Sequence, residues 1–241
     1  MATDLIRFDE VVAGYGALMI LNGLSFTAGQ GEVTLLIGPN GAGKSTVLKT
    51  FFGLLTPRQG DVVFQGRRLN GCPPAAVLSQ GVALVPQGRN LFPFLSLHHN
   101  LELGGITLPR QVRASRMDEV MDQFPQLRDR RHSLAASLSG GEQKQLEIAR
   151  ALLLRPSVLL IDEPSIGLSP KVSQAVFRLL RGLADAGASV LMVEQNVRSA
   201  LAVSDRVLVL EGGRLVQACP AAELIADPNL NRVFLGRHAA P

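Results

Sequence analysis

The chain has 241 residues and is 46% hydrophobic, which is enough to bury one large core or two small ones and excludes a disordered protein. Its 24 basic and 20 acidic residues leave a net charge of +4, with no tryptophan and a single tyrosine, so a surface that stacks nucleic-acid bases is not expected. No apolar run approaches the roughly 18 residues of a membrane helix, and residues 1–4 (MATD) lack the basic and apolar blocks of a signal peptide. Because Cys72 and Cys219 lie far apart and outside any C-x-x-C pair, we expect free thiols in a reducing, cytoplasmic compartment.

The first predicted elements are two strands, residues 5–12 and 20–28, which alternate loosely between apolar and polar residues and are bounded by glycines. They form an antiparallel unit. Tyr15 lies on the turn between them. An aromatic ring at such a turn more often packs on a sheet edge, and the alternative is that it stacks on the base of a nucleotide.

A phosphate-binding loop follows at residues 38–46 (GPNGAGKST), which match the pattern G-x-x-x-x-G-K-S/T. The loop comes after an apolar strand, residues 33–37, and before a helical pattern that runs from Val47 through Phe51 to Leu54 and Leu55. Its glycines let successive backbone N–H groups point inward at the positive end of a helix dipole, which makes a nest for phosphate oxygens.

Within this loop, Lys44 is expected to reach the β- and γ-phosphates, and the Ser45 hydroxyl to bind Mg²⁺. The predicted nucleoside triphosphate contacts are Gly38, Pro39, Asn40, Gly41, Ala42, Gly43, Lys44, Ser45 and Thr46.

Residues 60–69 read as a hairpin, Pro73 and Pro74 open a short helix to Gln80, and residues 82–85 form a strand. That strand ends at Gln87. Open α/β sheets place ligand contacts at the carboxyl ends of their strands, so Gln87 could touch Mg²⁺ or the γ-phosphate; a solvated loop glutamine is equally compatible with its position.

The character of the chain changes over residues 88–137, where prolines and glycines separate helical patterns that no longer alternate with strands. We interpret this region as an inserted helical subdomain, with Ser96 as the N-cap of a helix over residues 97–103. A second helix begins at the run LSGGEQ and stops before Pro156. Ser139, Gly140 and Gly141 at its N-terminus indicate a second anion site, although an ordinary helix cap would look the same in isolation.

The apolar strand over residues 158–161 ends in two adjacent carboxylates, Asp162 and Glu163. We expect Asp162 to hold Mg²⁺ opposite Ser45, and Glu163 to orient and polarise the attacking water. An amphipathic helix over residues 171–186 and a buried strand over 189–193 follow, and the strand leads to Gln195. Residues 207–210 and 214–217 form a closing hairpin, after which Pro220 starts a terminal helix.

In this order and spacing, the motifs resemble those of the ATP-binding subunits of ABC transporters. The resemblance runs nearly from end to end and rests on the phosphate loop GPNGAGKST, Gln87, the signature LSGGE and the strand VLLIDEP. LSGGE between the other two motifs is close to diagnostic. Local matches at PSIGLSP, VEQN and the C-terminal run VFLG (residues 233–236) are similar to the LivF type, an ATPase subunit of branched-chain amino-acid importers.

This resemblance implies a single ABC ATPase domain over residues 1–241. Its fold would be α/β, a RecA-like P-loop NTPase core with an N-terminal antiparallel β subdomain and an inserted α-helical subdomain. The insertion would span approximately residues 88–155 and carry the signature, while residues 1–87 and 156–241 form the nucleotide-binding core and the β subdomain. Tyr15 would then stack on adenine.

The resemblance also implies an ATPase that uses ATP and Mg²⁺, with Glu163, Gln195 and Gln87 as its catalytic residues. Two ATP-binding subunits would dock head to tail, the second being another copy or a LivG-like partner, so that the signature of one meets the γ-phosphate held by the other. They would drive two membrane permease subunits at the inner face of the cell membrane, with a periplasmic or extracellular binding protein as an indirect partner and no nucleic acid. Importers of urea or short amides, and ABC ATPases outside transport, are the alternatives.

Two positions depart from the family pattern. Gln195 stands where most members have histidine, and Ser169 stands where they have aspartate. A glutamine can donate a neutral hydrogen bond to the γ-phosphate but carries no proton charge, which argues against a mechanism with a histidine acid.

Overall fold

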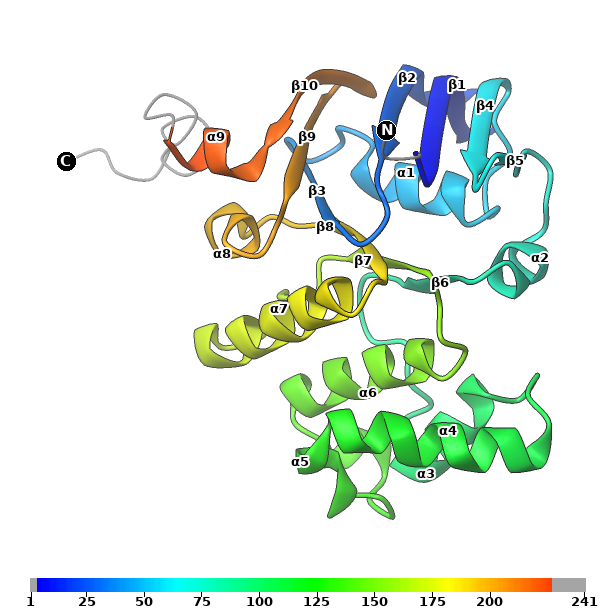
Figure 1. Ribbon diagram of the computed structural model, residues 1–241, viewed down its shortest axis with the longest axis vertical. Coiled ribbons are helices and arrows are strands. Elements are labelled where there is room, and N and C mark those ends of the chain that lie inside the picture. The colour runs from blue at the N-terminus through cyan, green and yellow to red at the C-terminus, as the bar shows by residue number, and fades with distance from the viewer. Residues whose placement is uncertain (1–3, 227–241) are drawn as a thin grey trace.

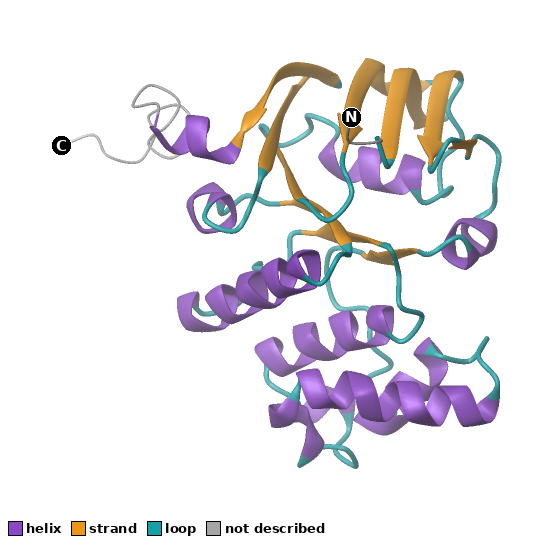
Figure 2. Ribbon diagram, in the orientation of Figure 1, coloured by secondary structure: helices purple, strands orange, loops and turns teal. Residues whose placement is uncertain are grey.

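The structure is a computed structural model that describes residues 4–226. Its strands form two sheets at one end of the molecule and most of its helices gather at the other, as Figures 1 and 2 show. The strands are β1 Ile6–Tyr15, β2 Leu18–Ala28, β3 Val33–Ile37, β4 Gln59–Phe64, β5 Arg67–Arg68, β6 Val82–Val85, β7 Val158–Asp162, β8 Ser189–Val193, β9 Arg206–Glu211 and β10 Arg214–Pro220. The helices are α1 Lys44–Phe51, α2 Pro74–Ser79, α3 Leu97–Gly104, α4 Arg110–Gln123, α5 Pro125–Arg128, α6 Gly140–Leu152, α7 Pro170–Asp185, α8 Val197–Leu201 and α9 Ala221–Ala226, with a short 3-10 helix over Ala135–Ser137.

The larger sheet has the order β10-β9-β3-β8-β7-β6, parallel except for the antiparallel edge strand β10. Every residue of β3, β7 and β8 is buried, as expected for strands that are covered on both faces. Because parallel strands end at the same edge of a sheet, the segments that follow these three strands and β6 lie close together. The smaller sheet, β2-β1-β4-β5, is antiparallel throughout, so the predicted α/β core with an antiparallel β subdomain is confirmed.

Helix α1 lies between the two sheets and fills the core between them (Figure 1). Phe51 of this helix packs edge-on against Phe8 of β1 and Phe64 of β4, with ring centroids 6.2 and 5.9 Å apart. Burying three such rings anchors the helix, and therefore fixes the loop that precedes it.

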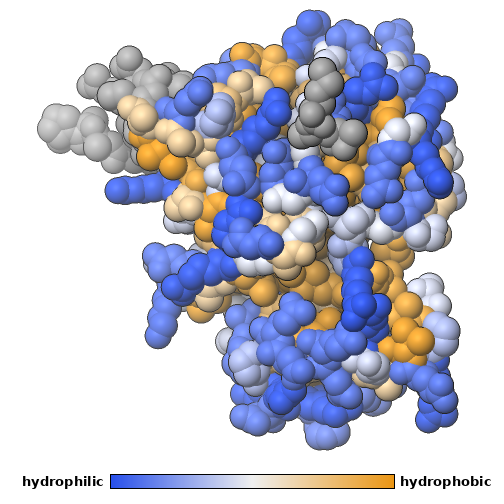
Figure 3. Space-filling view, in the orientation of Figure 1, coloured by the Kyte–Doolittle hydropathy of each residue, from blue (hydrophilic) through white to orange (hydrophobic). Residues whose placement is uncertain are grey.

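A second core lies on the opposite face of the larger sheet, where α7 covers the strands and α3, α4, α5 and α6 form a helical layer beyond it (Figure 1). Apolar surface is visible at the waist between the strands and this helical layer in Figure 3. Among residues 4–226, no helix is both long enough and apolar enough to cross a bilayer.

Several element boundaries differ from the sequence predictions. Helix α1 ends at Phe51 instead of continuing to Leu54 and Leu55, because Gly53 turns the chain at a φ of 78° and packs against the Cys72 carbonyl, which a Cβ at Gly53 would approach to 2.4 Å. Pro220 pairs in β10, so the following helix begins one residue later.

Two further predictions, and one helix that was not predicted, concern chain ends and turns. Tyr15 closes strand β1 and pairs with Leu18, so it belongs to the sheet and not to the turn. Helix α8 was not predicted from the sequence. The C-terminal VFLG run, residues 233–236, lies outside the described residues.

Candidate nucleotide and magnesium site

The loop between β3 and α1 has the tight geometry that its glycines predict. Gly38 lies against the Leu210 carbonyl, which a Cβ would approach to 2.1 Å, and Gly43 has a φ of 102° immediately before the helix. Neither position accepts a side chain without moving the backbone. The loop is also tied to the turn between β9 and β10, because the Gly213 N–H donates to the Ala42 carbonyl at 3.1 Å.

Lys44 is the first residue of α1, and its side chain curls back over the loop. Its Nζ donates to the carbonyls of Gly38 and Pro39 at 2.9 and 3.0 Å. Burial lowers the pKa of Lys44, while the carboxylates of Glu163 and Asp162 oppose this shift. An ammonium group that is partly desolvated and faces a ring of backbone dipoles is suited to a polyanion such as a phosphate chain.

Asp162, at the end of β7, is buried, and the Ser45 hydroxyl at the start of α1 lies near enough to oppose the rise in its pKa. Burial raises the pKa of Asp162, and the neighbouring Glu163 carboxylate adds to this effect. Its Oδ1 is the buried side-chain oxygen or nitrogen that lacks a hydrogen-bond partner within residues 4–226. A desolvated carboxylate oxygen without a donor, beside a serine hydroxyl, fits a hard cation such as Mg²⁺.

No group of three or more His, Cys, Asp or Glu side chains in the described part of the chain is placed to hold a metal. Proteins commonly bind Mg²⁺ through one or two side chains together with substrate phosphates and water.

Glu163 is held by two glutamines that reach it from opposite sides. Gln87 Nε2 donates to Glu163 Oε2 at 2.6 Å, and Gln195 Nε2 donates to Glu163 Oε1 at 2.5 Å. The strand order explains the arrangement, because β7 lies between β6, which leads to Gln87, and β8, which leads to Gln195. Each carboxylate oxygen keeps a second lone pair with which it can accept a proton.

Glu194 holds the backbone on either side of this hydrogen-bonded group, a role that sequence reasoning missed. Its buried carboxylate accepts backbone N–H bonds from Ser165 at 2.8 Å, Gln195 at 3.0 Å and Asn196 at 3.1 Å. The bonds join the turn after Glu163 to the segment after β8. The available signal in the sequence was an acid directly after the apolar run of residues 189–193 and directly before Gln195.

A cleft of about 360 Å³ lies between the β3–α1 loop and the strand ends, and it brings together Lys44, Ser45, Gln87, Glu163 and Gln195. Tyr15 stands at its rim with 44% of its surface exposed, and its ring lies 5.6 Å from Lys49 Nζ. Ile20 of β2 also lines the cleft, which sequence reasoning missed because the position depends on the register between β1 and β2. The cleft is lined by Tyr15, Ile20, Asn40, Gly41, Gly43, Lys44, Ser45, Thr46, Gln87, Glu163 and Gln195.

The signature residues do not line this cleft. Ser139 is the N-cap of α6 and forms a capping box with Glu142, in which Ser139 Oγ accepts from the Glu142 N–H at 3.3 Å. The backbone N–H of Ser139 donates to the Glu142 carboxylate at 2.7 Å, and this bond lowers the pKa of Glu142. Helix α6 lies in the helical layer, apart from α1 and its loop (Figure 1).

The fold and the cleft define a P-loop protein that binds the phosphates of a nucleotide. The family described as ABC transporter matches residues 21–166. The chain is 39% identical to the high-affinity branched-chain amino acid transport ATP-binding protein BraG of Pseudomonas aeruginosa, over 96% of this chain and 100% of that protein. It is 36% identical to the probable branched-chain amino acid transport ATP-binding protein LivF of Archaeoglobus fulgidus, over 96% of this chain and 99% of the relative.

A similar solved structure is the dimeric post-hydrolysis state of an ATP-binding cassette bound to ADP and Pi. It has a TM-score of 0.79 and 25% identity, over 90% of this chain and 98% of that one. The chain therefore belongs to the ABC transporter family, in which it is an ATP-binding subunit with ATPase activity.

Proposed function

We propose that the chain is the ATP-hydrolysing subunit of an importer for branched-chain amino acids and works at the cytoplasmic face of the membrane. The names of both curated relatives, which match it over nearly their whole length, support this substrate class. The observation that carries the proposed chemistry is the Glu163 carboxylate, held at the rim of the phosphate loop by Gln87 and Gln195.

In this mechanism the residues of the cleft divide the work. Tyr15 packs on the adenine, the backbone N–H groups of residues 38–46 surround the phosphates, and Lys44 exchanges its carbonyl partners for phosphate oxygens. The Asp162 carboxylate, the Ser45 hydroxyl and the Gln87 amide oxygen would hold Mg²⁺, which neutralises phosphate charge when bound. Glu163 orients the attacking water and takes its proton.

We further propose that the site is completed by a second ATP-binding subunit, either another copy or a LivG-like partner. Ser139, Gly140 and Gly141 begin a helix outside the cleft of their own chain, yet their N-terminal position suits an anion. The solved relative described above as a dimer with ADP and Pi supports such an arrangement. ATP bound at both interfaces stabilises the dimer, and hydrolysis removes that stabilisation.

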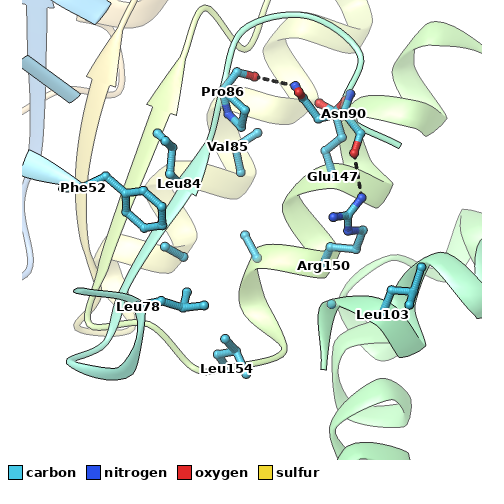
Figure 4. A pocket seen from close by; sticks show the side chains of 13 residues that line it. Phe52, Leu78, Leu84, Val85, Pro86, Asn90, Leu103, Glu147, Arg150 and Leu154 are labelled. Atoms are coloured by element: carbon cyan, nitrogen blue, oxygen red, sulfur yellow. Dashed lines mark hydrogen bonds between the residues drawn. The ribbon is translucent and has the colours of Figure 1, made fainter. Parts of the chain in front are cut away.

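The helical insertion, which we place at approximately residues 88–155, would connect this cycle to two permease subunits. A groove of about 290 Å³ lies between β6 and α6 and is mostly apolar, with Asn90, Glu147 and Arg150 along one side (Figure 4). The groove lies between the strand layer and the helical layer, where a short cytoplasmic segment of a permease could bind. A periplasmic or extracellular binding protein would supply substrate to the permeases and would be an indirect partner of this chain.

The variant Glu163→Gln tests the assignment of the base. A glutamine keeps the size of the side chain but takes up no proton, so we expect turnover to fall by at least about a hundredfold, while ATP binding remains and an ATP-bound dimer accumulates. Steady-state phosphate release, nucleotide titration and light scattering measure these three properties. Glu119→Gln, on the exposed face of α4, is the control and should behave as wild type. Wild-type turnover in Glu163→Gln would show that Glu163 is not the base.

A further inference from the structure

In the loop that joins β6 to α3, the backbone of Asn90 makes two short hydrogen bonds to side chains of α6. Its N–H donates to Glu147 Oε1 at 2.7 Å, and its carbonyl accepts from Arg150 Nη1 at 2.7 Å. Glu147 and Arg150 lie one turn apart on the same face of α6. Both backbone polar groups of Asn90 are thus bound by the helix that begins with the signature residues.

The acceptor on α6 is itself held in place. Glu147 forms an ion pair with Lys144 at 2.5 Å, and both side chains are almost completely buried. Lys144 Nζ also lies 3.5 Å from the Gly88 carbonyl in the same loop. Because a buried pair cannot lose one partner without stranding the other charge, the Glu147 carboxylate has little freedom to leave Asn90.

The side chain of Asn90 turns back along the loop toward the catalytic cleft. Its Nδ2 donates to the Pro86 carbonyl at 3.1 Å, drawn in Figure 4, and to the Gln87 carbonyl at 3.3 Å. These carbonyls belong to the two peptide planes on either side of the Gln87 Cα, so the bonds set the direction in which the Gln87 side chain leaves the backbone. Asn90 is exposed, so burial does not account for this conformation.

We propose that Asn90 is a positioning residue for ATP hydrolysis, which links α6 to the backbone of Gln87 and so keeps the Gln87 amide on Glu163. The inference rests on the proposed role of Glu163 as the base. Since Asn90, Glu147 and Arg150 also line the groove of Figure 4, a segment that binds in the groove contacts the residues that orient Gln87.

Asn90→Asp tests the proposal, because it replaces the amide donor by an acceptor of the same size at an exposed position. The two bonds to the Pro86 and Gln87 carbonyls are lost, while the backbone bonds to α6 need no side chain. We expect kcat to fall by about tenfold or more, with the melting temperature and the affinity for ATP unchanged. Glu119→Gln again serves as the control within the helical layer.

A double-mutant cycle with Gln87→Ala separates a positioning role from a general structural one. If Asn90 acts through Gln87, Asn90→Asp causes no further loss of kcat in the Gln87→Ala background. Hydrogen exchange of the backbone N–H groups of residues 87–91 in the nucleotide-free chain should also be faster in Asn90→Asp, whatever the turnover of the preparation.

The proposal is overturned if Asn90→Asp keeps wild-type kcat and exchange, or if its loss of kcat is equally large without the Gln87 side chain. Failure of the proposed base is a different result, namely wild-type turnover in Glu163→Gln.

Discussion

The two neighbouring carboxylates at the end of β7 have opposite surroundings. Glu163 receives an amide N–H on each oxygen, whereas Asp162 has a buried oxygen without a donor. The first arrangement holds a carboxylate in position for chemistry. The second arrangement destabilises the folded chain unless a cation binds the carboxylate. The cost of keeping a cation site empty therefore falls on Asp162.

This difference predicts how Asp162→Asn changes stability. Burial raises the folded-state pKa of Asp162 above its value in the unfolded chain. The contribution of Asp162 to the free energy of unfolding is therefore fully present below its ordinary pKa, and it is lost as pH rises through the raised pKa. At neutral pH, without nucleotide or Mg²⁺, removing the charge should therefore raise the melting temperature by about 2–4 °C. This gain in melting temperature should disappear as the pH is lowered to the ordinary pKa of an aspartate.

Thermal unfolding of both proteins across this pH range, in the presence of a chelator, measures the effect. Addition of Mg²⁺ and ATP should then stabilise the wild type more than Asp162→Asn. A lower melting temperature for the metal-free variant at neutral pH would contradict the prediction.

At the scale of elements, most strands and helices could be predicted because their ends carry local signals. The strands at residues 33–37, 82–85, 158–161 and 189–193 are mainly apolar runs with glycine, proline or charged residues at or close to their ends, and the structure confirms them to within one residue. The end of α1 depends on the contact of Gly53 with Cys72, far along the chain, and α8 has no side-chain cap. Neither feature is visible in a local pattern.

The same limit applies to the site. Gln87, Asp162, Glu163 and Gln195 could each be placed at a strand end from the sequence. That both glutamines converge on Glu163 depends on β7 lying between β6 and β8, and strand order is a property of the tertiary fold.

The two signature glycines have different surroundings, which gives a prediction for α6. A Cβ on Gly141 would lie 2.5 Å from Val172 Cγ1 of α7, whereas a Cβ on Gly140 would be 3.7 Å from Leu168. Gly141→Ala should therefore destabilise the chain by about 1–3 kcal/mol, because α6 and α7 must move apart. Gly140→Ala should leave stability unchanged. Urea unfolding compares the two variants.

Val172→Ala provides the control for this steric argument. It removes the two methyl groups that a Cβ on Gly141 would meet, so Gly141→Ala should cost much less in the Val172→Ala background. An equal loss in both backgrounds would mean that Gly141 is needed for a reason other than close packing of α6 on α7.

At the scale of the whole molecule, the cleft and the signature of one chain belong to different layers, and our proposal joins them only between two chains. Mixing two inactive variants tests this directly. Lys44→Ala lacks the phosphate-binding amine but keeps its signature, and Gly140→Asp places a negative charge at the signature but keeps its cleft. In a mixed dimer, the intact cleft of one chain meets the intact signature of the other, so one of the two sites is complete.

We expect each variant alone to be inactive and the mixture to recover ATPase activity as the proportions approach equality, measured by phosphate release. Wild-type chain diluted with Gly140→Asp is the control for subunit exchange. If the subunits exchange but the mixture stays inactive, the two parts of the site do not come from two copies of this chain.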